Sequence, residues 1–177
     1  MDKEKYTHIV IRYYDDIKRV AYAGCKNIYD AEDITQTVFL KLSQYTGSFE
    51  DDEHIKKWLV KVAVNESRSL WRSPWRSKSA VDEPDIIYHP ADMGDSGSDV
   101  MEAVMSLKRK YREVIHLFYY EEYSAREIAG VLGISENAVF KRLERARYQI
   151  RCRLDPKGLA ATDTLRDTGE AICKTGI

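Results

Sequence analysis

Cysteine is scarce in this sequence, and long apolar runs are absent. The three cysteines, Cys25, Cys152 and Cys173, are an odd number at wide spacing, without the rhythm of disulfide pairs or metal ligands. We therefore expect reduced thiols, as in cytosolic proteins. No stretch approaches the roughly 18 apolar residues of a membrane-spanning helix, and the polar start Met1–His8 is unlike a signal peptide. These absences predict a cytoplasmic protein without membrane insertion.

Basic residues are missing from one internal segment. No lysine or arginine lies between Ser79 and Leu107, although the formal net charge of the whole chain is only −1. Acidic residues are concentrated there: Asp82, Glu83, Asp85, Asp92, Asp95, Asp99 and Glu102. Basic residues crowd both sides of this segment. Two basic segments separated by an acidic one can present strong local fields to an anionic partner in spite of the near-neutral total.

Strand-like alternation is also lacking, and apolar residues recur at helical spacing along most of the chain. The sequence therefore predicts an all-α fold of two small helical domains, residues 1–76 and 99–154. Residues 77–98, rich in acidic and turn-forming residues, are expected to form a flexible linker, and 155–177 a disordered tail. Asp30 is expected to be the N-cap of the helix that follows it.

Residues 124–151 carry the signature of a helix-turn-helix. Ser124-Ala125-Arg126-Glu127 has the form of a capping box, in which the Ser124 hydroxyl and the Glu127 carboxylate each accept from the other residue's backbone amide. Gly133 can end this helix in a left-handed conformation, and Ser135 can cap the next one. The inward positions of the second helix are apolar: Val139, Leu143, Ala146 and Ile150. Two helices joined by such a corner match the DNA-binding motif.

The outward face of that second helix is basic. In a helix-turn-helix the N-terminal part of the second helix enters the major groove, and later basic residues contact phosphates. The candidate DNA contacts are Ser135, Glu136, Asn137, Phe140, Lys141, Arg142, Glu144 and Arg145. The alternative is an αα-hairpin with a solvated basic face, but the cap, the glycine corner and the one-sided charge favour DNA binding.

Two constellations stand out in the first domain. The helix after residue 30 has a polar face of Asp30, Glu32, Asp33, Gln36, Thr37 and Lys41, which alone is most simply a solvated surface. Its carboxylates lack the His, Cys or shielded pocket of a metal or acid–base site, so neither an enzyme nor a cofactor is indicated. The second constellation interleaves aromatic and basic residues: Phe49, His54, Lys57, Asn65, Arg68, Trp71 and Arg72. This mixture suits single-stranded DNA, whereas the spacing of Trp58 places it in the core.

Taken together, these motifs resemble those of bacterial RNA polymerase sigma factors of the extracytoplasmic-function group. The matching stretches are 30–39, 58–65, 107–114 and 124–147, in the family's order and spacing, and the resemblance covers roughly residues 5–154. It implies that the Asp30–Lys41 helix docks on the clamp helices of the largest subunit of core RNA polymerase. It also implies that Asn65 and the 49–54 loop hold a flipped base of the melted −10 element. The helix-turn-helix would bind the −35 element and touch the polymerase flap, and an anti-sigma factor is a possible further partner.

Some positions depart from the family pattern. Ser69 stands where the family often has Asp, Lys108 where it often has Pro, and Phe140-Lys141 replaces a common Arg-Ser pair. Lys can donate to guanine and Glu144 can accept from cytosine, so an unusual −35 preference is expected. The main alternative function is a stand-alone helix-turn-helix regulator that does not bind polymerase. That alternative leaves the 30–39 and 58–65 motifs unexplained.

Overall fold

The computed structural model describes residues 2–72 and 98–155. It has helices α1 (Lys3–Cys25), α2 (Ile28–Ser43), α3 (Asp52–Arg72), α5 (Ser98–Ser106), α6 (Arg109–Tyr119), α7 (Ala125–Leu132) and α8 (Glu136–Leu154). No strand occurs in these two ranges, which confirms the all-α prediction. Almost all of the predicted linker and tail falls outside the described residues. Within them, no helix is long and apolar enough to cross a membrane.

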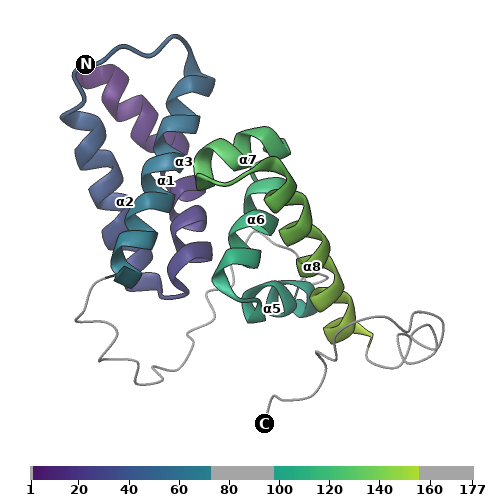
Figure 1. Cartoon of the computed structure of the whole chain (residues 1–177). Helices are drawn as coiled ribbons and strands as arrows, with labels where there is room; N and C mark the ends of the chain where they lie inside the picture. The colour runs from purple at the N-terminus through teal and green to yellow at the C-terminus, as the bar shows by residue number, and fades with distance from the viewer. Residues whose placement is uncertain (1, 73–97, 156–177) are drawn as a thin grey trace.

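Helices α1, α2 and α3 form one bundle around buried residues such as Ile17, Leu42 and Leu59 (Figure 1). A Cβ on Gly24 would lie 2.7 Å from the Cβ of Ser67, so α1 and α3 approach too closely there for a larger residue. The Trp71 indole donates to the Gly24 carbonyl oxygen at 3.2 Å and joins the same two helices. This crossing sets where the end of α3 lies relative to α1.

The turn between α1 and α2 differs from the sequence-based expectation. Lys26 ends α1 in the left-handed region, at φ 62°, and Asn27 caps α2. The Asn27 side chain accepts from the backbone amides of Tyr29 at 2.9 Å and Asp30 at 3.1 Å. The prediction that Asp30 is the N-cap is therefore wrong: Asn27 already satisfies these amides, and Asp30 lies in the first turn.

Helices α5 to α8 form the second group, and α7 and α8 are the predicted helix-turn-helix. The capping box of Ser124 and Glu127 is present, Gly133 is left-handed at φ 64°, and the Ser135 hydroxyl accepts from the Ala138 amide at 3.2 Å. Val139, Leu143 and Ala146 are buried, and Ile150 is partly buried against the same core. The predicted helix-turn-helix is confirmed, including the residues that cap its two helices.

The two groups of helices pack against each other, a contact that the sequence did not predict. Helix α1 lies against α6, and α3 lies against α7 (Figure 1). Buried side chains of both groups form one continuous hydrophobic cluster. Arg112 of α6 spans the boundary by donating to the Ala23 carbonyl oxygen of α1 at 2.5 Å. We call this boundary the seam.

Candidate nucleic-acid and polymerase interfaces

The N-terminal half of α8 is open to solvent. Ser135, which precedes the helix, is exposed together with Glu136, Asn137, Phe140, Lys141, Glu144 and Arg145, while Arg142 is half-buried. The Phe140 ring is 55% exposed although it is apolar. Burial of Val139, Leu143 and Ala146 against the rest of the second group fixes which way this face points. The predicted recognition residues therefore form one accessible surface.

Arg147, one of the later basic residues of α8, contacts aromatic side chains of α6. Its Nε donates to the Tyr119 hydroxyl at 2.8 Å, and its guanidinium lies 5.5 Å from the centroid of the Phe118 ring and 5.6 Å from that of Tyr119. These contacts join the end of α6 to α8. Arg147 therefore stabilises the packing of the recognition helix, and the pairing depends on two aromatic residues far away in the sequence.

An aromatic cluster forms between α2 and α3. The Phe49 ring stacks on Tyr45 at 4.8 Å between centroids and meets the edges of His54 at 5.5 Å and Trp58 at 5.9 Å. Tyr45 also lies 5.1 Å from Trp58. The structure thus brings together the predicted Phe49 and His54. It adds Tyr45, which sequence reasoning missed, and Trp58, which is only partly buried and so belongs to this cluster as well as to the core.

Further along α3, Asn65 and Arg72 are exposed, and Trp71 is 50% exposed. Lys61 is exposed as well, one helical turn before Asn65. The sequence analysis did not single out Lys61, although its four-residue spacing from Lys57 and Asn65 was the available signal. Asn65 therefore has a lysine on its own face of the helix.

Two predicted −10 residues on α3 are engaged with the second group. Lys57 lies 2.7 Å from a carboxylate oxygen of Glu127 and 2.5 Å from one of Glu53. The hydrogen bond from Lys57, followed by those from Ser124, lowers the pKa of the Glu127 carboxyl to about 2. Arg68 donates to the Leu132 carbonyl oxygen at 2.7 Å and lies 3.4 Å from Glu113. Both cations are occupied in this conformation.

On α2, the predicted docking residues separate into two sets. Asp33 and Gln36 are exposed, and so is Lys41, which pairs with Glu66 at 2.6 Å. Asp30 and Thr37 are half-buried, and the half-buried Glu32 pairs with Lys18 of α1 at 2.7 Å. The three half-buried side chains are therefore less accessible to a large partner than Asp33, Gln36 and Lys41.

Two apolar residues that sequence reasoning missed extend this surface. Tyr29 is 67% exposed and Leu40 59% exposed. With Asp33 and Gln36 they follow the i, i+4, i+7, i+11 spacing of one helix face. We call these four residues the α2 stripe. Exposed apolar side chains such as these are available for burial against a partner protein.

We also searched the described residues for side chains that could bind a metal ion. No group of three or more His, Cys, Asp or Glu side chains there is arranged to hold a metal ion.

Comparison with known proteins identifies both groups of helices. The model of Sigma-70 region 2 matches residues 9–77, and that of Sigma-70, region 4 matches residues 98–150. Together the two models cover more than half of the chain.

Individual relatives are similar over most of the chain. The ECF RNA polymerase sigma factor SigW of Bacillus subtilis is 27% identical to this chain in an alignment that covers 86% of this chain and 90% of SigW. The probable RNA polymerase sigma factor RfaY of Xanthomonas campestris is 27% identical over 163 residues, but these cover only 41% of RfaY. The sigma factor RpoE, solved with the anti-sigma factor NepR from Bartonella quintana, shares the fold, with a TM-score of 0.71 at 24% identity over 87% of this chain and 99% of that chain. The chain belongs to the sigma-70 family, in its extracytoplasmic-function group of RNA polymerase sigma factors.

Proposed function

We propose that the protein binds core RNA polymerase and directs it to promoters by contacting the −35 element as duplex and the −10 element as melted DNA. The observation that carries this proposal is the presence of two different nucleic-acid surfaces on one chain. The open half of α8 suits the major groove, and the Phe49 aromatic cluster with Asn65 suits unpaired bases. A stand-alone regulator needs only the first of these surfaces.

The −35 contact is made by the exposed residues at the start of α8. Lys141 donates to guanine, Glu144 accepts from cytosine N4, and Phe140 packs against a thymine methyl group. Arg145, exposed further along, neutralises a backbone phosphate. This division assigns sequence preference to the first turns of the helix and sequence-independent affinity to the later ones.

The −10 contact uses the aromatic cluster and the exposed side of α3. Rings such as Phe49 and Tyr45 offer stacking surfaces, while the Asn65 amide can exchange hydrogen bonds with the edge of an extruded base. Lys61 and Arg72, exposed on the same helix, follow the strand's phosphates. Holding an unpaired base in this way offsets part of the cost of melting, about a few kcal/mol per base.

Core polymerase docks on the α2 stripe. Tyr29 and Leu40 lose water on contact with the clamp helices of the largest subunit, and Asp33 and Gln36 between them supply polar specificity. The second domain touches the flap. The sequence alone also predicted Asp30, Glu32 and Thr37 as polymerase-binding residues, and this proposal gives the main contacts to the exposed residues of the α2 stripe.

We assign these roles to successive parts of the chain. Residues 1–76 form the polymerase-docking and −10 domain, 77–98 an acidic linker directed toward the active-site cleft, and 99–154 the −35 domain, followed by a tail at 155–177. The protein acts in the cytoplasm as a non-enzymatic specificity subunit, and an anti-sigma factor that covers these surfaces is its natural inhibitor.

Reconstituted transcription tests the proposal. Core polymerase with the purified protein is expected to initiate at a small set of sites in fragmented genomic DNA, whereas core alone gives only background. A stand-alone regulator would bind duplex DNA tightly without any such initiation. That result would overturn the proposal.

Core docking has its own test. Asp33→Arg with Gln36→Ala is expected to weaken binding to core polymerase by about tenfold or more, since charge and hydrogen bonds at the centre of an interface are lost. Duplex binding by α8 is expected to stay unchanged. Asp15→Arg is the matched control, because Asp15 is exposed on α1 outside the α2 stripe. Equal loss of core binding in both proteins would exclude the α2 stripe as the docking surface.

A further inference from the structure

Lys41 lies on α2 but outside the α2 stripe. Its Nζ reaches across to α3 and lies 2.6 Å from a carboxylate oxygen of Glu66. Leu40, one residue earlier, belongs to the stripe and is 59% exposed. Successive residues of a helix differ by about 100° in direction, so these two neighbours point to different partners. The side of α2 that carries Lys41 faces α3.

The ion pair of Lys41 and Glu66 lies beside the proposed −10 surface. Tyr45 follows Lys41 by four residues, just beyond the end of α2, and its ring belongs to the Phe49 aromatic cluster. On α3, Glu66 directly follows the exposed Asn65. The pair is therefore adjacent in the chain to both parts of that surface.

The two parts of the −10 surface are far enough apart for a strand to run between them. Trp58, the member of the aromatic cluster on α3, precedes Asn65 by seven residues, or roughly 10 Å along the helix axis. A single strand that stacks one base on the cluster and offers another to Asn65 must therefore place its backbone along this stretch. Lys61 supplies one cation there, on the exposed side of α3. Lys41 supplies a second cation from α2.

The ammonium of Lys41 keeps donors for a second partner. Its side chain is 46% exposed and pairs with the Glu66 carboxylate, whereas an ammonium has three N–H donors. Lys57, by comparison, lies within ion-pair distance of two carboxylates, those of Glu53 and Glu127. Glu66 therefore fixes the direction of a flexible side chain without using all of its donors. This arrangement lowers the entropy that is lost when a phosphate binds.

The pair is not needed to hold α2 against α3. The two helices already share a buried core, which includes Leu42 of α2 and Leu59 of α3. The side chains of Lys41 and Glu66 are 46% and 26% exposed, and ion pairs in such exposed positions contribute little to stability. Replacement of Lys41 is therefore expected to leave the fold intact, so that an effect on binding can be measured.

We propose that Lys41 is a strand-binding residue of the −10 surface and not, as the sequence alone predicted, a polymerase-docking residue. It donates to a backbone phosphate of the melted strand beside Asn65, and Glu66 is the positioning residue that holds it over α3. The inference rests on the proposed −10 role of α3 and the Phe49 aromatic cluster. It gives α2 two separate faces, so that one helix contacts polymerase through the α2 stripe and the melted strand through Lys41.

The test uses the full chain with core polymerase and a DNA fragment from a start site found by reconstituted transcription, with its non-template strand left unpaired at −10. Lys41→Gln is expected to bind this fragment about fivefold more weakly at about 0.1 M salt, the effect of one lost phosphate contact on a single strand. The slope of log K against log salt is expected to fall in magnitude by about 0.7. Affinity for core polymerase is expected to stay unchanged. Lys41→Arg keeps the cation and is expected to restore both the affinity and the slope.

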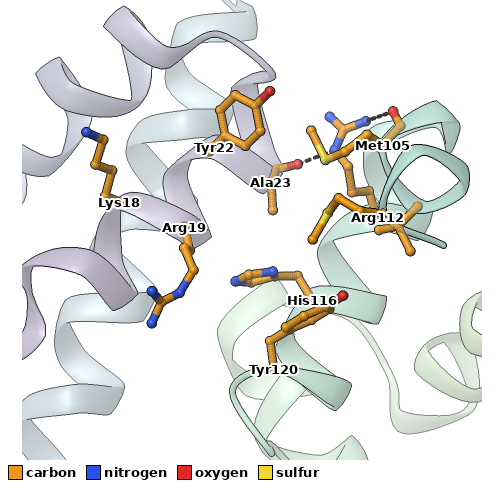
Figure 2. Close-up of a pocket in the computed structure, with 10 residues that line it drawn as sticks. Lys18, Arg19, Tyr22, Ala23, Met105, Arg112, His116 and Tyr120 are labelled. Carbon is orange, nitrogen blue, oxygen red and sulfur yellow. Dashed lines mark hydrogen bonds between the residues drawn. The ribbon is translucent and has the colours of Figure 1, made fainter. Parts of the chain in front are cut away.

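The matched control is Lys18→Gln, because Lys18 of α1 forms the same kind of pair, with Glu32 of α2 at 2.7 Å. Lys18 lines a pocket between α1 and the second group (Figure 2). Its partner Glu32 precedes Lys41 by nine residues on α2, or roughly 13 Å along the axis. The control therefore removes the same charge away from the −10 surface, and its strand affinity is expected to equal that of the wild type. An equal loss in both variants would reduce the effect to net charge and overturn the inference.

Three other results would also overturn the inference. Loss of core affinity in Lys41→Gln would return Lys41 to the docking surface, unchanged strand affinity would remove it from the −10 surface, and a Lys41→Arg protein as weak as Lys41→Gln would exclude charge as the cause. Asn65→Ala separates these failures from failure of the proposed function. If Asn65→Ala weakens strand binding and Lys41→Gln does not, the inference is wrong and the function stands. If the wild type supports no initiation with core polymerase, the proposed function fails and the inference fails with it.

Discussion

Arg112 offers a quantitative test of how the helices are held together. It is 2% exposed, and its guanidinium donates to the carbonyl oxygens of Ala23 at 2.5 Å, Leu107 at 2.7 Å and Met105 at 3.4 Å. The first bond crosses the seam, and the other two hold the end of α5 against α6. Arg112→Met preserves much of the side-chain volume and removes every donor.

The magnitude follows from these three contacts. Two are short bonds from a charged donor, and each such bond contributes about 1.5–3 kcal/mol, while the 3.4 Å contact adds little. Ala23 and Leu107 lie near the ends of helices, where water can replace part of the lost donors. We therefore expect the free energy of unfolding to fall by about 3 kcal/mol, at the low end of the range.

Urea unfolding followed by two probes measures this loss. All three tryptophans, Trp58, Trp71 and Trp75, lie in the N-terminal half of the sequence, whereas circular dichroism reports the helices of both groups. Because the Ala23 bond crosses the seam, the midpoints of the two signals are expected to separate in Arg112→Met. The control is Arg126→Met, the same change on an exposed position of α7. A loss equal to that of the control, or below about 1 kcal/mol, would refute the reasoning.

Three further predictions concern the second domain. Lys141→Ala is expected to relax the preference for one −35 base pair by about 1–3 kcal/mol. Arg145→Ala is expected to weaken binding to all duplexes alike and to reduce the salt dependence of binding, the slope of log K against log salt, by about 1. Identical effects of the two substitutions would contradict the division between base contacts and phosphate contacts. Arg147→Ala is expected to lower stability by about 1 kcal/mol in thermal unfolding without changing that slope, and Tyr119→Phe to cost less. The pKa of Glu127 is lower in the folded protein than its ordinary value of 4.5. The ionised carboxylate therefore stabilises the fold fully at pH values above 4.5, and this stabilisation is lost as the pH falls toward 2. The stability difference from Glu127→Gln should therefore shrink over that interval; a constant difference would exclude the ion pair as its source.

Features encoded within a few neighbouring residues were predictable from the sequence. The helix-turn-helix is the clearest case, since Ser124, Glu127, Gly133 and Ser135 act on backbone groups at most four residues away. The start of α2 shows the limit of the same reasoning, because Asn27 and Asp30 are both good caps and only the geometry of the α1–α2 turn selects Asn27. The predicted all-α fold is confirmed for the same local reason, the helical spacing of apolar residues.

Contacts between distant residues were decided only by the tertiary structure. In the sequence, Lys57 belongs to a run of aromatic and basic residues, Glu127 to a capping box, and Arg147 to the basic residues of its helix, and nothing pairs Lys57 with Glu127. Lys57 and Glu127 are 70 positions apart in the sequence, and Arg147 and Tyr119 are 28 positions apart. No local pattern specifies such pairs, because they depend on how α3 meets α7 and how α6 meets α8. The sequence by itself thus determined the helices and the caps of the helix-turn-helix and predicted the residues of the two proposed nucleic-acid surfaces, whereas packing alone decided which of the cations among them contact the other group of helices.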